Sequence, residues 1–270
     1  MINTFVSLYP LIVSLLCLVI TFFISYFTIP EIIIISRRKR LVDKPDHRKI
    51  HTYVTPNLGG VALFSTTLIV TMLLDTEKYF PEYSLLFASM LLIFTMGLKD
   101  DLVEISPQKR IIFEFLSVML IVLVADIRVK SMHGLFGIYE LPYFVSVIFS
   151  IIGITFVTNA YNLIDGVDGL CGGLGLIGML FLGTYFLSTN NIGVAMFAFC
   201  MAGALLGFLR YNFSRARIFM GDNGSLVLGL SITALCILFS ERPTPVNAGG
   251  FLANLDPNGK LPIVIAIISI

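Results

Sequence analysis

The stretch LIVSLLCLVITFFISYFTIPEIIII, residues 11–35, decides the fold class of this chain. It is longer than the ~20 apolar residues that a helix needs to cross the hydrocarbon core of a bilayer. No basic segment precedes it and it lacks a convincing small-residue cleavage site, so it differs from a signal peptide. We therefore predict a first transmembrane helix that is retained in the mature protein.

The remainder of the chain is equally apolar. Of the 270 residues, 57% are hydrophobic and 13% are charged, whereas soluble domains average roughly 45–50% and about 25%. Further apolar segments lie at residues 58–74, 83–98, 111–125, 142–158, 173–187, 192–209, 225–239 and 261–270. They predict an all-α fold, a polytopic transmembrane bundle of about nine helices in one membrane domain over residues 1–270. The last segment stops in mid-helix, so we expect C-terminal helices to be missing.

Charge and cysteine usage exclude other classes of protein. The net charge is only +1, which leaves no overall electrostatic footprint for nucleic acid. The four cysteines are scattered along apolar runs without the spacing of metal ligands. Residues 126–141 carry two glycines between apolar segments and predict a short hairpin or turn.

Lysine and arginine are distributed unevenly between the two sides of the predicted bundle. The loops after the first, third, fifth and seventh helices hold thirteen of them, and the opposite side holds five. Cytoplasmic loops carry the excess of basic residues in membrane proteins. We therefore predict that the odd-numbered loops face the cytoplasm and that the N-terminus lies outside.

Three acidic clusters fall on this same predicted cytoplasmic side. The segment 83–98 leads into Lys99-Asp100-Asp101, residues 159–170 read NAYNLIDGVDGL, and residues 219–226 read FMGDNGSL. Carboxylates are costly beside hydrocarbon, so several of them indicate a polar site at the membrane face. Like charges that converge need a cation, and oxygen ligands suit Mg²⁺ or Mn²⁺. These clusters predict a membrane enzyme that handles phosphates.

The pair Asp100-Asp101 has two interpretations. Adjacent side chains point about 100° apart on a helix, so both reach one centre only near a frayed helix end. In the functional interpretation one carboxylate holds a metal ion while the other accepts a proton. The alternative is a solvated helix terminus with an acidic cap for the next helix.

The second cluster has a helical period. Asn159, Asn162, Asp165 and Asp168 are spaced one turn apart, which predicts that they share one helix face. Amide side chains can donate to phosphate oxygens and accept from sugar hydroxyls. The glycines within the cluster predict either a close backbone approach to a ligand or a break in the helix.

The third cluster and the first cytoplasmic loop also leave alternatives open. Asp222 is either the N-cap of the following helix, with Ser225 in a reversed capping box, or a metal ligand. Free N–H groups at that helix start suit phosphate in both cases. Basic and amide side chains of the loop either bind an anionic nucleotide or lipid phosphate or add to the topogenic charge. These loop residues are Arg48, Lys49, His51 and Asn57.

Together, Asp100-Asp101, residues 159–170 and Gly221–Ser225 resemble the polyprenyl-phosphate N-acetylhexosamine-1-phosphate transferases, or glycosyltransferase family 4. Motif order, spacing and membrane side all match over residues 43–229. The sequence RKIH at residues 48–51 is more similar to the WecA/TagO branch than to the peptidoglycan translocase MraY. Glu104, where MraY proteins usually carry lysine, indicates the same branch.

The resemblance implies a reaction at the cytoplasmic face of the bacterial plasma membrane. A UDP-sugar, typically UDP-N-acetylglucosamine, gives its sugar 1-phosphate to undecaprenyl phosphate and releases UMP. The resemblance also implies ten or eleven helices and is compatible with a homodimer. It further implies a late loop rich in His and Arg, which this chain lacks.

The residues allow a mechanism in which metal bridging and positioning dominate. We expect Asp222, with Asp100 and Asp168, to hold Mg²⁺ or Mn²⁺. One of Asp100 and Asp101 would orient or deprotonate the lipid phosphate, while Asp165 and Asp168 shape the site. Substrate contacts are expected from Arg48, Lys49, His51, Asn57, Asn159, Asn162 and Asn223.

Competing functions have different signatures. A secondary transporter keeps its carboxylates near the membrane midplane on broken helices, whereas these acids gather at one face. A CDP-alcohol-type lipid transferase carries its aspartates in one compact motif, whereas this chain spreads them over three loops. Within the resembling family, the phospho-N-acetylmuramoyl-pentapeptide transferase is the alternative.

Overall fold

The computed structural model describes residues 6, 9–39, 41, 55–103 and 105–242. Over these residues the regular structure is helical, as predicted. The predicted helix at residues 261–270 and the basic loop at residues 42–54 lie outside the described residues. The α-helices are α2 (Pro10–Lys39), α3 (Gly59–Leu73), α4 (Tyr83–Leu102), α5 (Pro107–Met119), α6 (Tyr143–Ile164), α7 (Leu170–Ser188), α8 (Ile192–Asn212) and α9 (Asp222–Glu241).

The helices have the dimensions of a membrane bundle. Five of them, α2, α6, α7, α8 and α9, are long and apolar enough to cross a bilayer. Their outward residues are large and apolar, as lipid contact requires, since Phe27 on α2 and Phe156 on α6 are among the exposed side chains. The prediction of an all-α polytopic membrane protein is confirmed.

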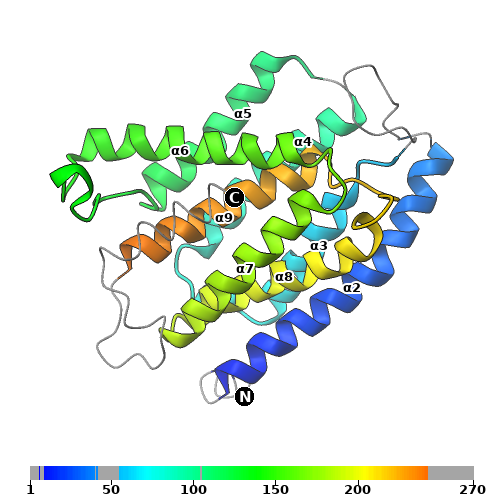
Figure 1. Ribbon diagram of the computed structural model, residues 1–270, viewed down its shortest axis with the longest axis horizontal. Helices are drawn as coiled ribbons and strands as arrows, with labels where there is room; N and C mark the ends of the chain where they lie inside the picture. Colours follow the sequence, from blue (N-terminus) through cyan, green and yellow to red (C-terminus); the bar gives the residue numbers. More distant parts are fainter. Residues whose placement is uncertain (1–5, 7–8, 40, 42–54, 104, 243–270) are drawn as a thin grey trace.

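Helix α9 is the centre of the bundle. It lies between α4, α6 and α7 in Figure 1, and the whole of its apolar window is buried. Three glycines allow this close packing. A Cβ atom on Gly97 of α4 would lie 2.6 Å from the backbone carbonyl of Asp222, and one on Gly60 of α3 would lie 2.2 Å from Gly224 Cα. A third, on Gly229, would lie 2.7 Å from Thr158 Cα of α6. Backbone contact at these points fixes the start of α9 relative to its neighbours.

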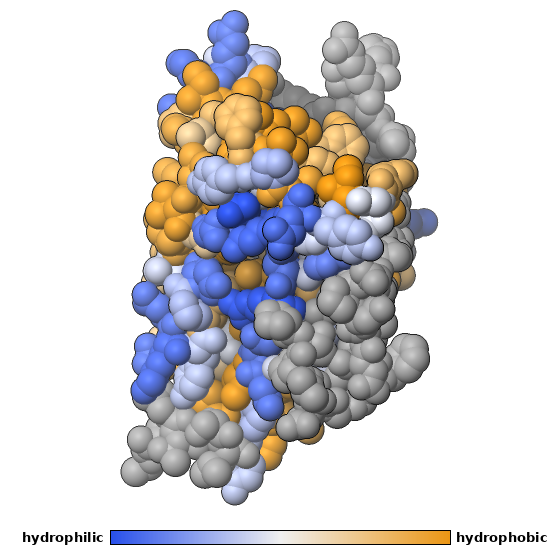
Figure 2. Space-filling view, turned by 90° about the vertical axis from the view of Figure 1, so that its left-hand side faces the viewer, coloured by the Kyte–Doolittle hydropathy of each residue, from blue (hydrophilic) through white to orange (hydrophobic). Residues whose placement is uncertain are grey.

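The two ends of the bundle differ. One end gathers the last turns of α4, α6 and α8 and the first turns of α5, α7 and α9 (Figure 1). The other end carries the predicted hairpin, in which Ser131 pairs with Glu140 across the turn η3 (Leu135–Gly137). Figure 2 views this second end and shows hydrophilic surface across its middle, flanked by hydrophobic surface. The acidic clusters all belong to the first end, which we call the acidic end.

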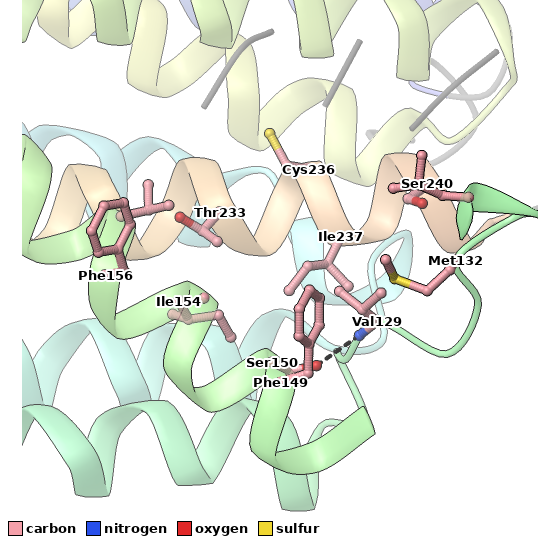
Figure 3. A pocket seen from close by; sticks show the side chains of 13 residues that line it. Val129, Met132, Phe149, Ser150, Ile154, Phe156, Thr233, Cys236, Ile237 and Ser240 are labelled. Atoms are coloured by element: carbon pink, nitrogen blue, oxygen red, sulfur yellow. Dashed lines mark hydrogen bonds between the residues drawn. The ribbon is translucent and has the colours of Figure 1, made fainter. Parts of the chain in front are cut away.

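An apolar cavity of about 300 Å³ lies between α6 and α9, beside the hairpin (Figure 3). Its few hydroxyl groups are already hydrogen bonded, because Ser150 donates to Ser146 O and Thr233 donates to Gly229 O. The cavity therefore offers only hydrocarbon contacts. None of the predicted site residues that the structure describes lines it.

Replacing Gly97 with alanine should disturb the start of α9. The new methyl group would meet backbone atoms rather than a flexible side chain, so we expect a loss of roughly 1–3 kcal/mol in the free energy of unfolding. The measurement is thermal unfolding in detergent, followed with a thiol-reactive fluorogenic dye, since Cys17, Cys171, Cys200 and Cys236 are all buried in the folded protein.

Gly173 of α7 is the matched control. A Cβ atom there has no neighbour within 4 Å, and alanine is the better helix former by up to about 1 kcal/mol. Gly173→Ala should therefore leave the melting temperature unchanged or raise it. Equal melting temperatures for the two variants would contradict the close approach of α4 to α9.

Candidate active site

The Asp101 carboxylate ties three segments together at the acidic end. Its Oδ1 accepts hydrogen bonds from Asn57 Nδ2 at 2.8 Å and from the Asp222 backbone N–H at 3.2 Å. Its Oδ2 accepts from the backbone N–H of Asn223 at 2.9 Å and from Asn223 Nδ2 at 2.5 Å. With four donors around it, this carboxylate holds the first residues of α9 and the entry to α3 against α4.

Asp165 holds the same turn from the other side. It follows the last residue of α6, is 8% exposed, and accepts the backbone N–H groups of Gly221 at 2.8 Å and Met220 at 3.2 Å. Burial raises the pKa of Asp165 to about 7, although these two hydrogen bonds favour the charged form. Both oxygens are occupied by backbone donors, so the geometry gives Asp165 a positioning role.

Gly221 shows why the turn needs glycine. Its φ of +75° lies in the region that favours glycine, and a Cβ atom there would lie 1.8 Å from Asn57 O. Gly221 is also the N-cap residue of α9 and no side chain caps the helix. The capping interpretation of Asp222 is therefore wrong, because Asp222 is the first residue inside the helix and the Ser225 hydroxyl donates back to Gly221 O at 2.9 Å.

Asp100 and Asp222 converge on one cation. Arg110, in the first turn of α5, places Nη1 at 2.7 Å from Asp222 Oδ2 and 3.6 Å from Asp100 Oδ2. The other oxygen of Asp100 accepts the Ile105 backbone N–H at 2.8 Å. Asp100 and Asp101 thus diverge along α4, as adjacent helical residues must, and only Asp100 faces the cation.

The second cluster does not form one helix face. Helix α6 ends at Ile164, and the chain turns through Gly169, whose φ is +71°, before α7 begins. The prediction of a shared face was wrong because the glycines break the helix, the second of the two outcomes they allowed. Asp168 consequently lies beyond the end of α6 and accepts the Ala216 backbone N–H at 3.0 Å.

The two asparagines of this cluster lie within α6. Asn159 Nδ2 donates to Glu114 on α5 and to Thr155 O. The Asn162 amide nitrogen is buried beside the Asp222 carboxylate and interacts with it, although the contact does not meet the geometry of a normal hydrogen bond. A buried donor without a partner of ideal geometry is uncommon in proteins, and such a donor can turn to a ligand oxygen.

Three of the predicted site residues lie outside the described part of the chain, and two residues of the site were not predicted from the sequence. Arg48, Lys49 and His51 lie outside the described residues, so their predicted contacts stay predictions. Arg110 was counted only as a topogenic charge, although a basic residue in the first turn after an acidic pair was a signal for an ion pair. Asn212 was missed as well. It accepts the Gly169 N–H and donates to Ile218 O, both at 2.9 Å, and so ties two loops of the site together.

The donor set fits a magnesium ion that shares its coordination with a substrate. Within the described part of the chain, no three His, Cys, Asp or Glu residues form a complete metal cage. Mg²⁺ is usually held by one or two carboxylates, with phosphate and water completing its octahedron. Asp100 and Asp222 already approach one cationic nitrogen, and Asp168 lies apart from them. Asp168 as a metal ligand therefore has no support from this geometry.

Comparison with known proteins identifies the family of this chain. The family model described as glycosyl transferase family 4 matches residues 83–240, which include the three acidic clusters. This chain belongs to glycosyl transferase family 4. The sequence resemblance to that family is confirmed.

Individual relatives carry two kinds of name. The chain is 31% identical over 228 residues to a probable undecaprenyl-phosphate N-acetylglucosaminyl 1-phosphate transferase of Bacillus subtilis, covering 82% of this chain and 63% of the relative. It is 30% identical over 236 residues to the undecaprenyl-phosphate alpha-N-acetylglucosaminyl 1-phosphate transferase of Salmonella typhimurium, covering 82% and 62%. A phospho-N-acetylmuramoyl-pentapeptide-transferase of Clostridium beijerinckii is 32% identical over 214 residues, covering 73% and 64%. The chain thus spans less than two thirds of these relatives.

The buried Asp165 predicts a specific pH dependence of stability. The folded protein retains the proton up to a pKa of about 7, whereas an exposed aspartate loses it near 4. The acid therefore contributes stability below about pH 4 that is lost as the pH rises through 7. The asparagine in Asp165→Asn stays neutral across this range. Between pH 4 and 8 the free energy of unfolding should therefore fall less in this variant than in the wild type, and the difference should be up to roughly 4 kcal/mol. Circular dichroism at 222 nm measures both proteins across this range.

Asp126 provides the control at the opposite end. Although burial opposes it, the ion pairs with Lys130 and Arg128 hold the pKa of Asp126 below its ordinary value, so it titrates below this window. Asp126→Asn should keep the pH slope of the wild type. A slope for Asp165→Asn that also matches the wild type would show that Asp165 is not a buried acid.

Proposed function

We propose that this protein transfers N-acetylglucosamine 1-phosphate, or a related N-acetylhexosamine 1-phosphate, from a UDP-sugar to undecaprenyl phosphate and releases UMP. This reaction is the first membrane step in the synthesis of cell-surface polysaccharide. The observation that carries the proposal is the convergence of Asp100 and Asp222, which are more than a hundred residues apart in sequence, on one cation at the acidic end. Names of the Bacillus and Salmonella relatives support the substrates.

The reaction joins two phosphates of like charge. A phosphate oxygen of the lipid attacks the phosphorus that bears the sugar, the bond to the second phosphate breaks, and UMP leaves with the electron pair. Charge repulsion opposes this approach, so positioning and charge neutralisation supply most of the catalysis. Mg²⁺ or Mn²⁺ bound at the acidic end would provide the neutralisation for the diphosphate.

The chain's own residues have distinct roles in this proposal. Asp100 and Asp222 would hold the metal ion, and the Asn162 amide, which lies beside Asp222, would donate to a phosphate or sugar oxygen. Asp101 and Asp165 would act as positioning residues, because backbone and amide donors already occupy their oxygens. The backbone N–H groups at the start of α9 are already bound to Asp101 and to Gly221 O, so they are not available to an anionic ligand.

The membrane supplies the second substrate. The positive-inside distribution of lysine and arginine supports a cytoplasmic acidic end in the plasma membrane, with the N-terminus outside. Substrate lipid would approach the site from the inner leaflet. Membership of this family favours group transfer over secondary transport.

An assay of UMP release tests the proposal. The protein in membrane vesicles is incubated with undecaprenyl phosphate, MgCl₂ and either UDP-N-acetylglucosamine or UDP-N-acetylmuramoyl-pentapeptide. We expect UMP only with the first donor, with no release when EDTA replaces Mg²⁺. Release only with the pentapeptide donor would assign the function named for the Clostridium relative, and equal release in EDTA would exclude a metal-dependent mechanism.

Replacing Asp222 with asparagine removes one carboxylate from the cation but leaves its backbone in place. Turnover should fall by about a hundredfold or more, as for other groups that stabilise transition-state charge. Asp126→Asn, which breaks an ion pair at the opposite end, should keep wild-type turnover. Near-normal rates for both variants would rule out the acidic end as the active site.

A further inference from the structure

Arg110 occupies the position that the proposed function reserves for a metal ion. Its guanidinium contacts the Asp222 carboxylate at 2.7 Å and approaches that of Asp100 at 3.6 Å. These two carboxylates come from α9 and α4, whereas Arg110 belongs to α5. In this structure one protein cation therefore neutralises two carboxylates that would otherwise repel each other.

A third carboxylate lies one helical turn from Arg110. Glu114 follows it on α5 at the i+4 position, where side chains of a helix are neighbours. Glu114 is only 3% exposed, attracts Arg110, is repelled by Asp222, and accepts a hydrogen bond from Asn159. A buried carboxylate is stabilised by a nearby cation, so Glu114 offers a displaced Arg110 a favourable position.

We propose that Arg110 is a displaceable counter-cation that competes with the divalent metal ion for Asp100 and Asp222, with Glu114 as its alternative partner. Without metal, Arg110 keeps the two carboxylates together and preserves the geometry of the site. When a divalent ion binds, repulsion drives the guanidinium toward Glu114. Arg110 is then a positioning residue that sets how tightly the site binds metal. This inference rests on the proposed metal-dependent function.

Metal binding without substrates isolates this competition. Mn²⁺ serves as the probe, and electron paramagnetic resonance of free Mn²⁺ gives the dissociation constant in detergent at fixed ionic strength. Arg110→Gln removes the competing charge, so Mn²⁺ should bind about tenfold or more tightly than in the wild type. Arg110→Lys retains the charge and should stay within about threefold of the wild type. Arg128→Gln, which breaks a different arginine–aspartate pair, should bind Mn²⁺ as the wild type does.

Glu114 is tested through its dependence on Arg110. Glu114→Gln keeps an acceptor for Asn159 but removes the charge that receives Arg110, so Mn²⁺ binding should weaken. In the Arg110→Gln background the same change should have a much smaller effect, because the two residues act as one unit. Equal effects in the two backgrounds would exclude Glu114 as the alternative partner.

Several outcomes separate this inference from the proposed function. If Arg110→Gln binds Mn²⁺ no more tightly than the wild type, Arg110 does not compete with the metal ion. This conclusion holds even if Asp222→Asn abolishes Mn²⁺ binding and the enzyme remains metal dependent. Absence of Mn²⁺ binding in all variants overturns both. Thermal unfolding without metal gives an independent readout, since Arg110→Gln should lower the melting temperature of the metal-free protein and Mn²⁺ should restore it.

Discussion

The site depends on the hydrogen bonds that the Asp101 carboxylate accepts from two other segments of the chain. A charged carboxylate at the end of a membrane-spanning bundle is stable only when hydrogen-bond donors of the protein solvate its charge. Here the backbone at the start of α9 and two asparagine amides supply them. Asp165 completes the arrangement by holding the residues just before α9. The two acids together fix the turn that begins α9.

This fixed turn explains the packing of the bundle. Gly60 and Gly97 bring α3 and α4 into backbone contact with the first residues of α9, and Gly221 turns the chain where no side chain fits. The close approaches at Gly60, Gly97 and Gly221 therefore converge on the short segment that carries Asp222. The consequence for function is that Asp222 is presented at a defined place beside Asp100, where Arg110 neutralises both.

The sequence was sufficient to predict the helical architecture but not the role of each acidic residue in the site. Apolar segment lengths predicted the described helices, and the basic loops predicted that the acidic clusters share one end. Which carboxylate faces a cation depends on helix ends and turns, and the glycine-induced break after Ile164 separated Asp165 from Asp168. Arg110 was missed because its partner at 2.7 Å, Asp222, is distant in sequence and meets it only when the bundle packs together.

A double-mutant cycle between Asp101 and Asn223 tests the central claim most directly. Unfolding free energies would be measured for Asp101→Ala, Asn223→Ala and the double variant under identical detergent conditions. Contact between the two residues predicts a coupling energy of about 0.5–3 kcal/mol. If the two single effects instead add to within about 0.3 kcal/mol, the Asn223 amide does not bind Asp101 at the start of α9 and the account of the site is wrong.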